Sequence, residues 1–188
     1  MAYPSRKHRW TAEEYLAFER QSPTRHELID GEIYDMAGAS LEHNTINANV
    51  VMTLGVQLRG QACRVLSSDM RVKLGKANYS YPDIVVVCGK PEFEDKTADT
   101  LINPTVVFLI LSPTTERYDR GEKFQHYRAL SALQAYILVS QDAPRLEVYT
   151  RQPDGGWALA EYVGLDQRLT IPAIGCDVAL TDVYDRVF

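Results

Sequence analysis

The spacing of apolar residues changes several times along the chain, and each change predicts a new element. Apolar side chains recur at helical spacing in three segments: a short one that follows Thr11 and ends near Pro23, a long one from about Leu41 to Leu58, and one from Glu116 to Leu130. Glu14 follows Thr11 by three residues, which is the pattern of a capping box, and Ser40 can cap the second segment. All three segments are therefore predicted helices.

The other apolar runs predict strands. Asp83–Cys88 and Thr105–Leu111 are apolar at almost every position, which is typical of central strands covered on both faces. Shorter runs predict the remaining strands: Arg64–Leu66, Met70–Leu74, Ala135–Val139, a hairpin from His26 to Met36 around Asp30-Gly31, and a hairpin from Leu146 to Leu159 around Pro153–Gly156. The charged stretch from Gly89 to Asn103 predicts a surface loop.

Together these elements predict a mixed α/β (α+β) fold, with a central mixed sheet flanked by helices and a β-hairpin near the N-terminus. The chain has 188 residues and no long linker, so residues 1–188 are expected to form one domain. No apolar run approaches the roughly 20 residues of a membrane helix, and no apolar segment follows the basic start. Neither a membrane span nor a secretory signal is predicted.

Charge and cysteine content narrow the function classes. The net charge of -5 disfavours a protein that coats DNA, because Lys and Arg supply most of the nonspecific affinity for phosphates, but an enzyme can combine metal-binding carboxylates with a local basic patch. Of the three cysteines, Cys63 and Cys88 lie in apolar strand-like runs, where buried free thiols are expected, and Cys176 stands apart. There is no CxxC or Cys/His cluster, so a zinc site is not expected. With free thiols expected, a reducing cytoplasm is the expected location.

Two segments contain candidate functional residues, one at the start of a predicted strand and one on a face of a predicted helix. Asp83 follows Pro82 at the head of an apolar strand, where a metal could reach its carboxylate, although an Asp at a strand end is more often a solvated turn residue. Asp119, Lys123 and Tyr127 are spaced i, i+4 and i+8, so they lie along one face of the predicted helix. By spacing alone, an ordinary ladder of ion pairs explains this face equally well.

The hairpin and the long helix each contribute one further candidate. Glu27 alternates with Leu28, which also fits an outward-facing hairpin residue. His43 lies in the first predicted turn of the long helix, where a backbone group could satisfy it. Neither residue by itself supports a catalytic role.

Several motifs in the same order resemble the Uma-two family, whose members are restriction-endonuclease-like proteins of the PD-(D/E)XK nuclease superfamily. The motifs are HELIDGEIYDMAGAS followed by EHN, SSDMRVKL, YPDIVVVCG, LSPTTERYDRGEKFQHYRAL and LVSQDAPRLEVYTRQ. The resemblance extends from about Trp10 to Val187 and implies a restriction-endonuclease-like central sheet.

The resemblance also implies a metal site and a reaction. Asp83 and Glu27 would hold Mg²⁺ or Mn²⁺ through hard oxygen ligands, and the metal would activate a water for attack on a phosphodiester bond. Lys123 would offset the charge that builds on the transferring phosphate. These three residues are the expected catalytic residues, with His43, Asp119 and Tyr127 in support.

One position departs from the family pattern. The family has Glu two residues before its Leu-Ser-Pro, and this chain has Leu109 there, which cannot bind a metal and leaves Lys123 without that carboxylate neighbour. The leading hypothesis is a Mg²⁺-dependent DNA endonuclease, expected to act as a homodimer. The alternatives are a catalytically inactive nuclease fold that still binds its partner, and a module whose acidic surface binds another protein.

Overall fold

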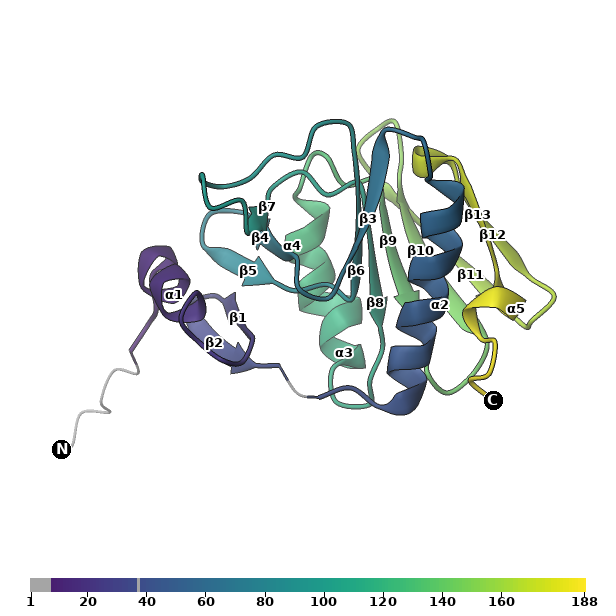
Figure 1. Ribbon diagram of the computed structural model, residues 1–188, viewed down its shortest axis with the longest axis horizontal. Helices are drawn as coiled ribbons and strands as arrows, with labels where there is room; N and C mark the ends of the chain where they lie inside the picture. Colours follow the sequence, from purple (N-terminus) through teal and green to yellow (C-terminus); the bar gives the residue numbers. More distant parts are fainter. Residues whose placement is uncertain (1–7, 37) are drawn as a thin grey trace.

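A six-stranded sheet organises the computed structural model, which describes residues 8–36 and 38–188 (Figure 1). Its order is β11-β10-β9-β8-β6-β3. The strands are β3 (Cys63–Ser67), β6 (Ile84–Cys88), β8 (Val106–Ile110), β9 (Ala135–Val139), β10 (Arg145–Arg151) and β11 (Trp157–Val163). Neighbours are antiparallel except β8 and β9, which are parallel and therefore need a crossover between them.

The crossover from β8 to β9 is helical but irregular. The helix predicted from Glu116 to Leu130 is divided into α3 (Glu116–Tyr118), a π-helical segment η1 (Asp119–Lys123) and α4 (Phe124–Arg128). A π-helical turn is often found at functional sites. Here it contains two buried charged residues, Asp119 and Lys123.

A second, five-stranded sheet has the order β2-β1-β5-β4-β7 and lies on the α4 side of the molecule, together with α1 (Figure 1). Its strands are β1 (His26–Ile29), β2 (Glu32–Asp35), β4 (Arg71–Leu74), β5 (Asn78–Ser80) and β7 (Thr100–Leu101). The predicted hairpin around Asp30-Gly31 is confirmed as β1 and β2. The expected loop from Gly89 to Asn103 contains the short strand β7, which pairs with β4.

The other face of the six-stranded sheet is covered by α2 (Leu41–Gln57), α5 (Leu180–Val183) and a small two-stranded sheet (Figure 1). That sheet consists of β12 (Arg168–Ile171) and β13 (Cys176–Ala179), joined by the 3-10 turn η2 (Pro172–Ile174). Side chains of β6 alternate between the two faces: Ile84 and Val86 join the α2 cluster, whereas Val85 and Val87 join the α4 cluster. This double coverage explains why the β6 sequence is apolar throughout.

Both predicted helix starts are confirmed. Thr11 and Glu14 form the capping box of α1 (Ala12–Glu19), and Ser40 accepts a hydrogen bond from the backbone N–H of His43 at the start of α2. None of the helices within residues 8–36 and 38–188 is long and apolar enough to cross a membrane.

The prediction that Cys63 and Cys88 are free thiols is wrong. Cys63 on β3 stands directly opposite Cys88 on β6, and the two form a disulfide across 25 positions of sequence. The sequence shows two separate apolar runs and does not reveal that these residues are cross-strand neighbours. Cys176 is free and buried.

Candidate functional site

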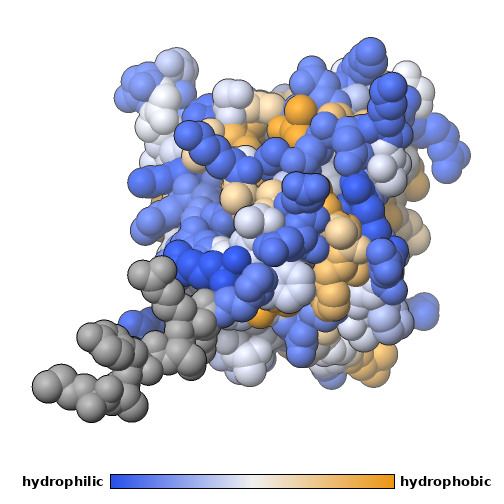
Figure 2. Space-filling model, turned by 90° about the vertical axis from the view of Figure 1, so that its left-hand side faces the viewer, coloured by the Kyte–Doolittle hydropathy of each residue, from blue (hydrophilic) through white to orange (hydrophobic). Residues whose placement is uncertain are grey.

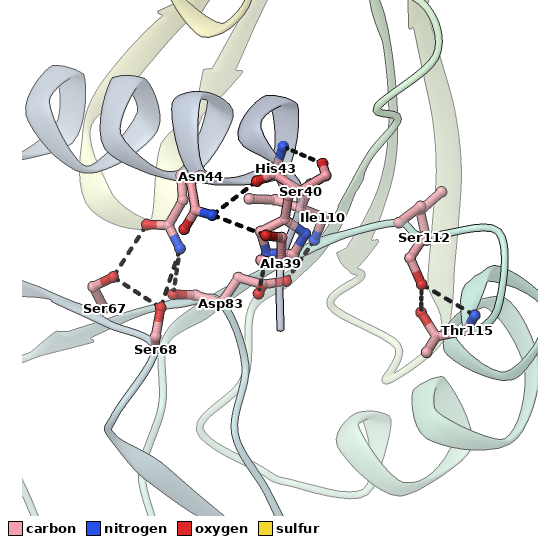
Figure 3. Close-up of polar contacts among 12 residues, drawn as sticks. Ala39, Ser40, His43, Asn44, Ser67, Ser68, Asp83, Ile110, Ser112 and Thr115 are labelled. Carbon is pink, nitrogen blue, oxygen red and sulfur yellow. Dashed lines mark hydrogen bonds and ion pairs between the residues drawn. The ribbon is translucent and has the colours of Figure 1, made fainter. Parts of the chain in front are cut away.

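Asp83 is held at the head of β6 by contacts on both carboxylate oxygens (Figure 3). Its Oδ1 lies 2.8 Å from His43 Nε2, and its Oδ2 accepts a hydrogen bond of 2.7 Å from the backbone N–H of Ile110. His43 comes from the first turn of α2 and Ile110 from the end of β8. The structure therefore brings the predicted residues Asp83 and His43 together, and the partner of the imidazole is a carboxylate.

A group of uncharged polar residues supports this end of the sheet. The backbone carbonyl of Asp83 accepts a hydrogen bond of 2.8 Å from the N–H of Ser68. Asn47, one turn along α2 from His43, donates to the Ser68 hydroxyl at 3.2 Å and accepts from the Ser67 hydroxyl at 3.1 Å. No sequence pattern marks these residues, because only the fold places the Asn47 amide of α2 beside the end of β3.

Glu27 and Lys123 form a second group. Glu27 Oε1 accepts hydrogen bonds from the Ser80 hydroxyl, from the backbone N–H of Tyr81 at 3.0 Å and from Lys123 Nζ at 3.0 Å. Glu27 is 8% exposed, so the prediction of an outward-facing hairpin residue is wrong. Its Oε1 lies between donors from β5, from the residue after β5 and from η1.

The predicted helix face is assembled around Lys123. Asp119 Oδ1 lies 3.6 Å from Lys123 Nζ, and the Tyr127 hydroxyl donates to the Ser80 hydroxyl at 3.3 Å. Lys123 therefore has two carboxylate neighbours, Glu27 and Asp119, in addition to any that position 109 could have supplied. The face is both an ion-pair ladder and part of a buried polar group.

Burial and charge act in opposite directions in this group. Burial alone would lower the pKa of Lys123, but Glu27 and Asp119 more than compensate, so its pKa lies above the ordinary value. Burial raises the pKa of Asp119, and Lys123 only partly opposes that effect. Lys123 thus stays an ammonium at neutral pH and supplies a fixed positive charge between two carboxyl groups.

Leu109 is part of the core. Ile84 pairs with Phe108, so continuing this antiparallel register by one residue sets Asp83 opposite Leu109. Leu109 is 3% exposed and belongs to the apolar cluster that contains Phe124 and Tyr127. A Glu at position 109 would stand beside Asp83, whereas Leu109 offers only carbon atoms.

The side chains in this arrangement do not fit a divalent metal ion. Mg²⁺ requires near-octahedral coordination by oxygen, usually from one or two carboxylates together with waters. Both oxygens of Asp83 already have partners, three donors surround Glu27 Oε1, and Leu109 contributes no ligand. Within residues 8–36 and 38–188, no three or more His, Cys, Asp or Glu side chains gather in a way that could hold a metal.

Comparisons with known proteins agree with one another. The model of the Uma2 family, described as "Putative restriction endonuclease", matches residues 12–181. Two uncharacterized Synechocystis proteins are each 35% identical to this chain. The match to slr1290 extends over 173 residues, which are 92% of this chain and 90% of that protein. The match to sll1609 extends over 155 residues, which are 82% of this chain and 88% of that protein. A crystal structure from Anabaena variabilis, titled as a putative nuclease belonging to DUF820, matches with a TM-score of 0.79 at 19% identity, covering 95% of this chain and 99% of its own.

Proposed function

The chain belongs to the Uma2 family of restriction-endonuclease-like proteins, and from this premise we propose that it binds nucleic acid without the metal-dependent hydrolysis of a nuclease. The observation that carries the proposal is Leu109, which stands opposite Asp83 where a second carboxylate would be needed. Hard divalent cations are held by charged oxygens, so the loss of one weakens the site strongly. Nucleic acid is proposed as the partner because of the family, and the loss of metal-dependent hydrolysis is proposed because of Leu109.

The partners of Asp83 favour the same function. A metal ion that used this carboxylate would have to share it with His43 and the N–H of Ile110, which already contact both of its oxygens. The site is therefore satisfied by the groups of the chain itself.

The second candidate function is a Mg²⁺-dependent endonuclease that hydrolyses phosphodiester bonds in DNA. It is favoured by the retention of Asp83, Glu27 and Lys123. It is also favoured by the hydrogen bonds of Glu27, because every described one falls on Oε1 and Oε2 is left for a metal. In that function Asp83 and Glu27 would be the ligands of Mg²⁺ or Mn²⁺, and Lys123 the cation beside the phosphate.

A cleavage assay and a binding assay on the same preparations separate the two functions. We expect the parent protein to shift DNA in a gel equally well with EDTA or Mg²⁺, and to leave supercoiled plasmid intact with Mg²⁺ or Mn²⁺. Plasmid nicking that disappears in Asp83→Ala would establish the endonuclease instead. If neither duplex nor single-stranded DNA is shifted at low salt, where phosphate contacts are strongest, nucleic-acid binding is refuted and pull-down assays should then seek a protein partner.

The proposal includes assembly as a homodimer. β11 is an edge strand of the six-stranded sheet and exposes Leu159 and Val163, which are 52% and 61% accessible. Two-fold pairing is the commonest assembly and would cover such an edge. Light scattering after size exclusion tests this directly. The cytoplasmic location stays a prediction, and the Cys63–Cys88 disulfide is not what a reducing compartment favours.

A further inference from the structure

A pocket of about 580 Å³ opens beside the N-terminal hairpin, and its lining includes none of the residues that surround Asp83 or Lys123. It is lined by Arg9, Trp10, Asp30, Gly31, Lys76, Ala77 and Asn78. Figure 2 views the molecule from the side of α1 and the hairpin, where hydrophilic side chains surround smaller apolar areas. A pocket with two cations and an aromatic ring differs in kind from the acidic groups of the candidate site.

The Asp30-Gly31 turn positions one wall of this pocket. Gly31 has a φ of +80°, and a Cβ added to it would lie 3.3 Å from the Cβ of Arg9, so glycine lets the Arg9 stem pack against the turn. The backbone N–H of Trp10 donates to the Gly31 carbonyl at 2.8 Å. Trp10 also lines the pocket, and its ring centroid lies 5.3 Å from that of Phe18, which helps to fix the position of the ring.

The opposite wall connects the pocket to the candidate site. Asn78 accepts from the N–H of Asp30 at 2.9 Å and donates to the Asp30 carboxylate at 3.2 Å. Asn78 is the first residue of β5, and Ser80, two residues further, donates to Glu27. In a strand, two residues span roughly 6.6 Å, so β5 leads directly from the pocket to the Glu27–Lys123 group.

The charge of the lining favours an anion. Arg9 and Lys76 are cations and Asp30 is the one carboxylate, which gives this pocket a net charge of +1 on a chain whose total is -5. Part of the Asp30 charge is already offset by the hydrogen bond from Asn78. Arg and Lys bind phosphates, and an aromatic face stacks on any base.

We propose that this pocket binds one nucleotide of a single-stranded nucleic acid, with Arg9 and Lys76 on the phosphate and Trp10 against the base. The inference rests on the proposed binding of nucleic acid and names where a strand lies. Because the contacts are to phosphate and to a π-face, the pocket accepts bases of any kind and needs no metal.

Tryptophan fluorescence reports on the pocket directly. The chain has two tryptophans, and Trp157→Phe leaves Trp10 as the only one while keeping a ring beside Phe124. We expect a single-stranded thymidine oligonucleotide, titrated in EDTA, to quench this fluorescence with a saturating curve. A signal that does not change while labelled oligonucleotide binds by anisotropy would place the strand elsewhere and overturn the inference.

Substitutions of the three residues then test each contact. The slope of log K against the logarithm of the salt concentration should become shallower by about 1.4 in the variant Arg9→Gln/Lys76→Gln. Each contact to a phosphate of a single strand contributes about 0.7 to that slope. Trp10→Ala should weaken binding by about fivefold or more, as expected for one lost stacking contact. Trp10→Phe should keep most of the affinity, which would show that the loss in Trp10→Ala comes from the missing ring and not from misfolding. The matched control Lys90→Gln/Lys96→Gln removes two exposed cations from the 89–103 segment and should change neither quantity by as much.

The outcomes distinguish the two proposals. If the parent binds the oligonucleotide and the pocket variants keep its affinity and salt slope, the pocket assignment is wrong and nucleic-acid binding stands. If the parent binds neither single-stranded nor duplex DNA at low salt, both are wrong. Quenching of Trp10 by the single strand without any shift of duplex DNA would support the pocket and restrict the proposed function to single strands.

Discussion

Restoring the missing carboxylate is the sharpest test of the site. In Leu109→Glu, the new side chain would stand beside Asp83 in a place where Leu109 is 3% exposed. Without metal, the substitution removes apolar burial worth about 1.5–3 kcal/mol and adds a carboxyl group close to another carboxylate. We therefore expect a destabilisation of about 3–5 kcal/mol, typical of an uncompensated buried charge.

The size of the metal effect can be worked out in the same way. For a chain of this size, 1 kcal/mol shifts Tm by roughly 2–4 °C, so the metal-free variant should unfold about 6–20 °C below the parent. A ligand at about 100 times its Kd returns about 2.7 kcal/mol, or about 5–11 °C. Mg²⁺ or Mn²⁺ should therefore raise the Tm of Leu109→Glu by several degrees and leave that of the parent unchanged.

Thermal unfolding with EDTA, Mg²⁺ and Mn²⁺ measures this, and Leu109→Gln is the matched control. The glutamine has nearly the same shape and loses the same apolar burial, but it lacks the charge that a hard cation needs. Adding Asp83→Asn to Leu109→Glu should abolish the recovery. The reasoning is refuted if the Glu and Gln variants respond alike to metal, or if the parent already gains as much stability as Leu109→Glu.

Three further predictions concern charge and cross-linking outside this position. Arg20 lowers the pKa of Asp99 to about 2, so the stabilisation from Asp99 is present above its ordinary pKa near 4 and is lost as the pH falls through 2. Asp99→Asn should therefore cost about 1 kcal/mol at pH 7 and progressively less below pH 4 in urea unfolding. Reducing the Cys63–Cys88 disulfide, which spans 25 positions, should lower stability by about 3 kcal/mol in thermal unfolding, and a double serine variant that still responds to reductant would contradict this. Burial raises the pKa of Asp119, so the stabilisation from the protonated carboxyl group is present below about pH 4 and is lost as the pH rises through the raised pKa. Over that interval the free energy of unfolding of Asp119→Asn should increase relative to that of the parent. A difference between the two proteins that does not change with pH would contradict this.

The elements that the sequence predicts well are those whose burial follows a simple period. The apolar positions Ile46, Val50 and Leu54 recur every four residues, and all three are fully buried on α2. The continuous apolar runs of β6 and β8 are central strands, as predicted. Strand β5 was not predicted, because its three residues form a strand only by pairing with β1 and β4, which no local pattern reveals.

The site was predicted only in part, and for a different reason. Spacing alone left Asp83, Glu27 and Lys123 as ordinary surface residues, and the family resemblance selected them. Their partners are distant in sequence: His43 and Asp83 are separated by 40 positions, and Glu27 and Lys123 by 96. Only the tertiary fold can specify such pairs.

The partners of these carboxylates show how groups of the chain itself can stabilise the acidic residues of this fold. Repulsion among buried carboxylates normally calls for a cation, and a bound metal supplies it. Here Lys123 lies between Glu27 and Asp119, while His43 and a backbone N–H hold Asp83. The folded state therefore balances its own charge, and a metal would have to compete with groups that are already in place.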